Sequence, residues 1–216
     1  MTTLLSLVAA ALMIPADAGA AGGTVEGHIT IAGKLKSLAI GAKVSDIVVY
    51  VESDSLAHGT WPPPKTAPLV VQRDKAFVPH VLPVLAGSEV EFYSVDPFLH
   101  NVNCRCEKNS STNFSMMKES RRKVRFDKPE IVRITCNIHA AMWAFVVVRD
   151  NPFFAVPDAS GAFKIEGLPP GTYTVRTWHE KLAGAEQTIV VPESAPATLN
   201  FDLPEKRAVK PTGGTT

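Results

Sequence analysis

The hydrophobic residues of this chain follow two patterns, apolar–polar alternation and short continuous apolar runs, and neither is the pattern of an amphipathic helix. Near the N-terminus, "GTVEGHITIAGK" alternates apolar and polar side chains between glycines, which predicts a half-buried strand. The run "VSDIVVYVES" (44–53) is rich in β-branched residues and predicts a buried strand. We therefore expect the chain to begin its folded part with two strands.

The middle of the chain carries the signals of further strands, separated by segments that are not regular. Three consecutive prolines in "HGTWPPPKTAP" (58–68) supply no backbone donors, so we interpret this segment as a boundary or a crossover. The polar stretch from 103 to about 120 is expected to be irregular. Apolar or alternating runs predict strands at 69–72, 77–85 and 89–94, two strands around a turn at 127–129, and another at 142–150.

The C-terminal part repeats the alternation of short strands and tight turns. In "FFAVPDASGAFKIEGLPPGTYTVRTWHEKLAGAEQTIVVP", the turn sequences "DASG" and "LPPG" separate alternating segments. The polar end of the chain, 205–216, is expected to be a disordered tail. Because the chain has no helical heptads, no internal repeat and no glycine-rich phosphate loop, we predict an all-β fold.

Composition and charge narrow the class of protein further. A chain of 216 residues suggests one or two domains, and 45% hydrophobic residues can build a core without a disulfide scaffold. A net charge of +1 gives no overall attraction to nucleic acid or to a membrane. The apolar run "LLSLVAAALMI" is too short to span a bilayer, and the small residues "ADAGA" follow it. We therefore expect residues 1–20 to be an export signal cleaved after Ala18 or Ala20, leaving a soluble periplasmic protein, although "MTT" lacks the usual basic residue.

The chemistry of the chain centres on "ITCNIHAAMW". An odd number of cysteines in an oxidising compartment leaves one thiol that needs protection, a partner or a metal. Taken singly, Cys136, His139 and Met142 are more often core residues than ligands. Together they offer three of the four ligands of a trigonal His₂Cys copper site with a long axial Met. His100, in "SVDPFLHNV" after a predicted strand, can supply the fourth, which makes one site of His100, Cys136, His139 and Met142.

The segments "AFVPHVLPVLAGSEVEFYSVDPFLHNV" and "VRFDKPEIVRITCNIHAAM" resemble the cupredoxins, or blue copper proteins, over residues 69–149. The spacing Cys-x₂-His-x₂-Met is similar to that of amicyanin-like members. Plastocyanin-like proteins described as putative methylamine utilisation proteins also share the pattern "PFFAV…LPPGTY…WHEKL", although that description names a gene neighbourhood rather than a reaction.

The resemblance implies a Greek-key β-sandwich that holds one type 1 copper. It implies an electron carrier rather than an enzyme, with a redox partner protein such as a cytochrome or a dehydrogenase. By the same resemblance, Asn101 links the two ligand loops and shields the thiolate, and electrons pass at the edge of His139. The apolar residues expected to form the docking surface there are Phe98, Leu99, Ala140 and Ala141.

The C-terminal pattern "DASGAFKIEGLPPGTYTV" resembles a different fold, the carboxypeptidase-regulatory-like, transthyretin-type β-sandwich. About fifty residues are few for a complete sandwich, so the first two strands of the chain are candidates for its missing part. We therefore hypothesise a cupredoxin domain at 61–150 inserted into a sandwich made of 21–60 and 151–204. The alternative is a tandem order in which the N-terminal strands join the cupredoxin sheet.

Several other residues leave alternatives open. Cys104 and Cys106 can form a disulfide, bind an auxiliary metal or stay reduced. With Met116 and Met117 they suggest a second function, copper sequestration or delivery, and a third is a structural module whose copper fold is vestigial. We interpret His80 and His179 as structural. A basic cluster is more simply a solvated strand edge than a docking patch: Lys118, Arg121, Arg122, Lys123 and Arg125.

Overall fold

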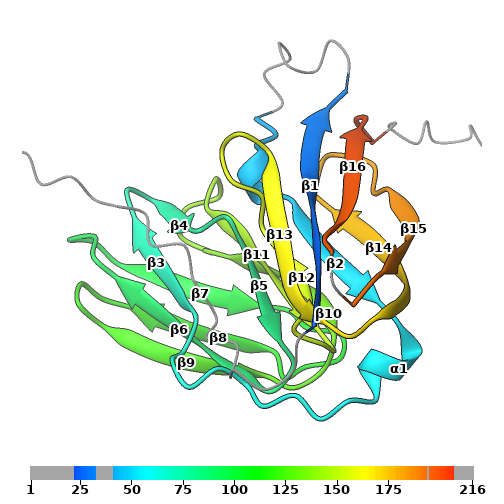
Figure 1. The fold of residues 1–216 in the computed structure, drawn as a ribbon. Helices are drawn as coiled ribbons and strands as arrows, with labels where there is room; N and C mark the ends of the chain where they lie inside the picture. Colours follow the sequence, from blue (N-terminus) through cyan, green and yellow to red (C-terminus); the bar gives the residue numbers. More distant parts are fainter. Residues whose placement is uncertain (1–21, 33–40, 194, 207–216) are drawn as a thin grey trace, which may run out of the picture.

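The computed structural model describes residues 22–32, 41–193 and 195–206, and strands dominate all three ranges (Figure 1). The predicted all-β class is confirmed, with four sheets and a single α-helix, α1 (Asp54–Ala57), among the described residues. No helix in these ranges is long and apolar enough to cross a membrane. The expected export signal and residues 207–216 of the expected tail lie outside the described residues.

Nine strands from the middle of the chain form two sheets around one apolar core, which we call the inserted sandwich. One sheet has the order β4-β3-β6-β9 and the other the order β5-β11-β10-β7-β8. The strands are β3 (Leu69–Arg73), β4 (Ala76–Val78), β5 (Val81–Leu85), β6 (Ser88–Ser94), β7 (His100–Cys104), β8 (Thr112–Met116), β9 (Arg121–Phe126), β10 (Glu130–Thr135) and β11 (Trp143–Arg149).

The remaining strands come from both ends of the chain and form a second pair of sheets, the split sandwich. Its sheets have the orders β13-β1-β16 and β12-β2-β14-β15, so both N-terminal strands lie between C-terminal ones. The strands are β1 (Gly23–Ile31), β2 (Val48–Glu52), β12 (Phe154–Ala155), β13 (Ala162–Leu168), β14 (Gly171–Trp178), β15 (Glu186–Val191) and β16 (Ala197–Leu203).

This strand pairing supports our proposal that one domain, residues 61–150, is inserted into another made of 21–60 and 151–204. In a tandem order β1 and β2 would pair with strands of the inserted sandwich. Instead β1 is antiparallel to β13 and parallel to β16, and β2 is antiparallel to β12 and β14. The two crossings of the chain between the sandwiches follow β2 and precede β12, which are neighbours in one sheet.

Three details differ from the sequence-based expectations. The strand expected at 77–85 is two strands in different sheets, because Pro79 between them has no N–H for a ladder. The stretch from 103 to 120, expected to be irregular, holds β8, an edge strand with one solvated face, where alternating polar residues are tolerated. Glu205 forms a bridge with Leu182, so the first residues of the expected tail belong to the fold.

The topology of the larger sheet of the inserted sandwich brings two distant segments to one end. β10 runs antiparallel to β7, with Thr135 opposite Asn103. The start of β7 and the end of β10 therefore lie at the same end of the sheet. β11 begins there as well, because Thr135 also pairs with Trp143. Residues 136–142 form the short loop between β10 and β11, beside the first residue of β7.

The proposed insertion predicts that damage to β1 loosens β16 without loosening the inserted sandwich. A Cβ added at Gly27, in the middle of β1, would lie 1.6 Å from the carbonyl oxygen of Leu199. We expect Gly27→Ala to force β1 and β16 apart and to lower the free energy of unfolding of the split sandwich by about 2–4 kcal/mol. Native-state hydrogen exchange should show faster exchange in β1 and β16 and unchanged exchange in β10 and β11.

Glu26→Ala, an exposed position on the same strand, is the matched control and should leave all four strands protected. Equal loosening of β10 and β11 by Gly27→Ala would contradict two separate domains.

Candidate metal centre

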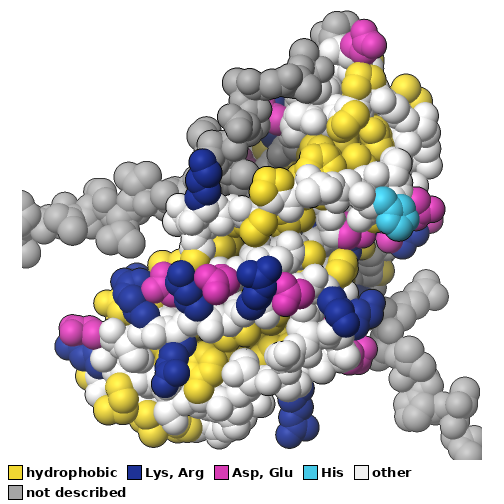
Figure 2. Space-filling view, turned by 90° about the horizontal axis from the view of Figure 1, so that it is seen from below, with side chains coloured by type: hydrophobic (Ala, Val, Ile, Leu, Met, Phe, Trp, Pro, Cys, Tyr) yellow, Lys and Arg dark blue, Asp and Glu magenta, His cyan; other side chains and the backbone are white. Residues whose placement is uncertain are grey.

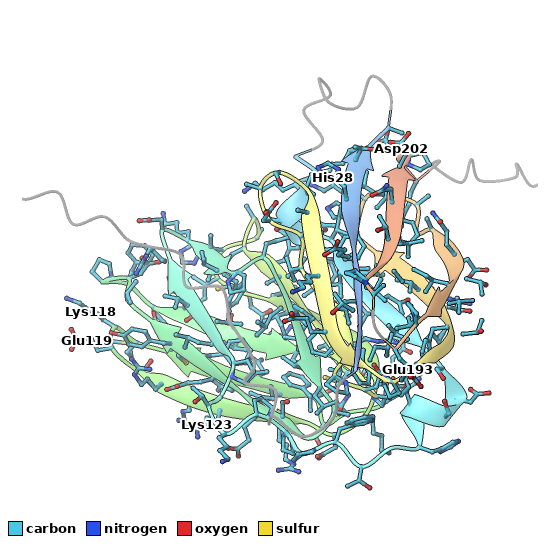
Figure 3. All side chains as sticks on the ribbon, viewed as in Figure 1. His28, Lys118, Glu119, Lys123, Glu193 and Asp202 are labelled. Carbon is cyan, nitrogen blue, oxygen red and sulfur yellow. The ribbon has the colours of Figure 1, made fainter. Side chains whose placement is uncertain are left out.

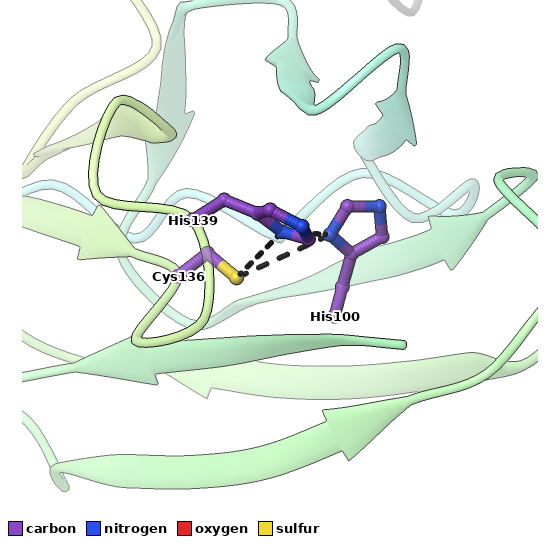
Figure 4. Close-up of side chains that lie close together, drawn as sticks. All are labelled: His100, Cys136 and His139. Carbon is purple, nitrogen blue, oxygen red and sulfur yellow. Dashed lines mark hydrogen bonds between the residues drawn. The ribbon is translucent and has the colours of Figure 1, made fainter. Parts of the chain in front are cut away.

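Three side chains meet at the end of the larger sheet of the inserted sandwich (Figure 4). His100 is the first residue of β7, and Cys136 and His139 lie in the loop that follows β10. Two backbone hydrogen bonds keep this loop tight: the N–H of Cys136 donates to the carbonyl of Met142 at 3.0 Å, and the N–H of Met142 donates to the carbonyl of His139 at 2.9 Å. The loop therefore presents Cys136 and His139 to His100 in a defined arrangement.

The donor atoms of these residues form a compact triangle. The two Nδ1 atoms of His100 and His139 are 3.1 Å apart, and the Sγ of Cys136 lies 3.7 Å from Nδ1 of His139 and 4.0 Å from Nδ1 of His100. A point equidistant from three atoms at these separations lies about 2 Å from each, close to the length of metal–imidazole and metal–thiolate bonds. The triangle thus fits a single metal ion.

The chemistry of the donors restricts which ions fit the triangle. Two imidazoles and a thiolate suit copper and zinc, whereas calcium and magnesium prefer oxygen ligands. His100 and Cys136 are buried, and His139 is half-buried. Burial lowers the pKa of His139, and His100 and Lys75 lower it further, so its ring is neutral and able to bind a metal near pH 7.

Met142 ends the same loop and is buried in the core of the inserted sandwich. Its backbone makes both hydrogen bonds that close the loop: its carbonyl accepts the N–H of Cys136, and its N–H donates to the carbonyl of His139. Its role as the axial ligand remains a prediction from the spacing and the resemblance.

Asn101 connects the two segments that carry the donors. Its Oδ1 accepts the N–H of Asn137 in the ligand loop, and its Nδ2 donates to Oδ1 of Asn113 on β8 at 2.6 Å. Its carbonyl accepts a hydrogen bond from Nε2 of the buried Gln72 at 3.2 Å. Asn101 is therefore held from three sides, in the place where the resemblance puts a residue linking the loops.

Asp96 is part of the site and was missed by the sequence analysis. Nε2 of His100, the nitrogen that faces away from the donor triangle, donates to Oδ2 of the buried Asp96 at 2.7 Å. The same carboxylate accepts the N–H groups of Asp74 at 2.8 Å and Lys75 at 3.0 Å. Burial opposes ionisation, but the hydrogen bonds from Lys75, His100 and Asp74 outweigh it and lower the pKa of Asp96.

Asp96 thus fixes the orientation and the tautomer of His100, with Nδ1 left free toward the triangle. The signal in the sequence was a carboxylate four residues before the candidate ligand, in "SVDPFLHNV". Metal-binding histidines commonly donate their second N–H to such a group.

Of the residues considered for an auxiliary copper site, the two cysteines lie close together, but the two methionines lie apart from them. The thiols of Cys104 and Cys106 are free, and burial, together with the neighbouring Cys106 thiol, raises the pKa of Cys104 well above its usual range. In the ladder between β7 and β8, Met116 is opposite His100 and Thr112 is opposite Cys104. Cys104 and Met116 therefore lie four residue steps apart along the strands, about 13 Å. Met116 is buried, whereas Met117 is exposed.

Exposed apolar side chains occur in the ligand loop beside His139 and just before β7. Phe98 and Leu99 are 38% and 42% exposed, and Ile138, which the sequence analysis did not single out, is 49% exposed. The ring of Phe98 meets those of His100 and His139 edge-on, with centroids 5.1 and 5.7 Å apart. Ala140 and Ala141 are exposed beside them.

The basic cluster on β9 is largely paired with acidic residues. Figure 2 shows basic and acidic side chains alternating in a row on one face of the molecule, and Figure 3 shows Lys118 beside Glu119 at the turn before β9. The ion pairs are Arg121–Glu91 at 3.0 Å, Lys123–Glu89 at 3.5 Å and Arg125–Asp127 at 2.7 Å. This edge is therefore not a uniformly positive surface.

Comparisons with known proteins find no matching family model and no matching curated protein. Among solved structures, a purple cupredoxin from Nitrosopumilus maritimus is 15% identical with a TM-score of 0.35, and the match covers 38% of this chain and 99% of that one. A point mutant of amicyanin in its reduced state is 21% identical with a TM-score of 0.36, covering 47% and 98%. A copper-containing nitrite reductase from Thermus scotoductus SA-01 is 19% identical with a TM-score of 0.37, covering 57% of this chain and 28% of that one. At this level of likeness, what the site does has to be inferred from its own geometry.

Proposed function

We propose that this chain is a type 1 (blue) copper protein that transfers electrons in the periplasm. One copper ion would be held by His100, Cys136 and His139, with Met142 as the axial ligand. The observation that carries the proposal is the donor triangle, whose three sides of 3.1, 3.7 and 4.0 Å fit one metal ion. A thiolate with two imidazoles and a thioether is the ligand set of a blue copper site.

Copper bound there supplies a one-electron couple between Cu(II) and Cu(I). The contribution of the chain is to fix the positions of the donor atoms. Asn101 ties the ligand loop to β7, Asp96 fixes the ring of His100, and two hydrogen bonds close the loop from Cys136 to Met142. A donor set held by the fold changes little between the two oxidation states, so little reorganisation opposes electron transfer.

The same assignment favours a carrier over an enzyme. Four protein ligands would leave no open position for a substrate, whereas catalytic metal sites keep one. The half-buried His139 lies among Phe98, Leu99 and Ile138, an exposed apolar patch that suits brief docking of a redox partner protein. A cytochrome or a dehydrogenase is the class of partner that such a carrier serves.

The first prediction is that the mature protein binds one equivalent of Cu(II) and develops an intense visible band from thiolate-to-copper charge transfer. Absorption and EPR titration would measure both. Cys136→Ser should abolish the band, whereas Cys104→Ser, the matched control at a buried thiol outside the triangle, should retain it. A colourless protein that binds several Cu(I) would favour sequestration or delivery, and no binding at all would favour a structural module.

The second prediction concerns Asp96. Asp96→Asn keeps the shape of the side chain but removes the negative charge that accepts the N–H of His100. We expect the affinity for Cu(II) to fall about 10- to 100-fold, as measured by competition with a chelator. Asp127→Asn, at an exposed carboxylate far from the triangle, is the control. Equal affinities of the Asp96 variant and the wild type would show that Asp96 only holds the turn at Asp74 and Lys75.

A further inference from the structure

The two sandwiches meet through an apolar contact that runs along β11. Val81 and Val147 of the inserted sandwich pack with Val48 of the split sandwich, and all three are buried. The rings of Phe145 and Trp178 meet edge-on at 5.2 Å across this contact. The interface therefore includes one whole face of the strand that begins at the ligand loop.

Glu180 of the split sandwich crosses this interface at the end nearest the donor triangle. Its Oε1 accepts a hydrogen bond from Nε2 of His80 at 2.8 Å, and its Oε2 accepts one from the indole Nε1 of Trp143 at 3.2 Å. Both donors belong to the inserted sandwich. Burial opposes ionisation of Glu180, but the bonds from His80 and Trp143 outweigh it and lower the pKa of the carboxyl.

Glu180 is itself held firmly in place. The neighbouring His179 is buried, and its Nδ1 accepts the N–H groups of Lys181 at 3.0 Å and Leu182 at 3.1 Å. Burial lowers the pKa of His179 to about 4, so the ring is neutral and can accept these bonds near pH 7. In addition, Nζ of Lys206 donates to the carbonyl of Glu180 at 3.1 Å. The carboxylate is thus presented from a rigid turn rather than from a free loop.

Trp143 connects this contact to the ligand loop. It directly follows Met142, whose carbonyl accepts the N–H of Cys136, and its backbone pairs with Thr135 on β10. The loop is therefore anchored between Thr135 and Trp143. An indole pinned by Glu180 leaves the end of the loop little freedom to shift.

We infer that Glu180 is a positioning residue for the metal site: by binding Trp143 it fixes the loop from Cys136 to Met142, so that the split sandwich sets the geometry of a site in the inserted one. This inference rests on the proposed function for its consequence at copper, but not for its effect on the loop. It also gives the split sandwich a role in positioning the metal site of the inserted sandwich.

The test compares Glu180→Ala with Tyr50→Leu in the full chain. Tyr50 also bridges the sandwiches, by stacking under the guanidinium of Arg149 at 3.9 Å, but at the far end of β11 from the loop. In the metal-free protein, hydrogen exchange of the Cys136 and Met142 amides should quicken about tenfold in Glu180→Ala, as expected when one hydrogen bond to a charged group is lost. Tyr50→Leu should leave both amides as protected as in the wild type.

With copper added, Glu180→Ala should also shift the visible band and the reduction potential, and Tyr50→Leu should not. Glu180→Gln should restore both readouts, because its amide can accept from Trp143 and donate to the other tautomer of His80. If Glu180→Ala leaves the exchange rates of the two amides and the copper spectrum unchanged, Glu180 only stabilises the interface between the sandwiches and the inference is wrong. If the wild type binds no copper, the proposed function fails, but the exchange of the metal-free loop still decides the role of Glu180.

Discussion

The structure depends on keeping two imidazole nitrogens and one sulfur within 4.0 Å of one another before any metal arrives. Such a cluster is costly to assemble, because polar atoms of the buried His100 and Cys136 lose their contact with water. The surrounding hydrogen bonds offset this cost. Asp96 satisfies the far nitrogen of His100, and Asn101 satisfies the N–H of Asn137. The site is thus organised by groups that do not belong to the triangle.

The three donors of the triangle were predictable from the sequence, whereas the carboxylate that supports them was not. Cys136, His139 and Met142 share one loop, so their spacing suggested ligands. The structure brings the first two to His100, and the role of Met142 stays a prediction. His100 was a candidate because "SVDPFLHNV" follows a predicted strand, and the order of a known family supported it, although nothing in the sequence states that β7 lies beside β10. Asp96 escaped notice because its importance depends on the turn at Asp74 and Lys75, which belongs to a different part of the chain.

The fold shows the same division. Alternating patterns identified most strands and the all-β class. The polar edge strand β8 was missed because solvated edges need no apolar face, and the strand expected at 77–85 proved to be two because Pro79 lies between sheets. The contact between Glu180 and Trp143 could not be predicted, since "WHEKL" gives no sign that its carboxylate accepts a hydrogen bond from an indole thirty-seven residues earlier in the chain.

The central position of β1 has a consequence for the order in which the chain can fold. β1 pairs with β16, so Val25 lies opposite Ala197 and the sheet cannot be completed until β16 is in place. Contacts this far apart in sequence form slowly. The strands from β3 to β11 are consecutive in the chain and pair only with one another, so they can fold first, whereas β1 and β2 stay unpaired until the C-terminal strands join them. The metal site would then form before the split sandwich, whose Glu180 positions the ligand loop.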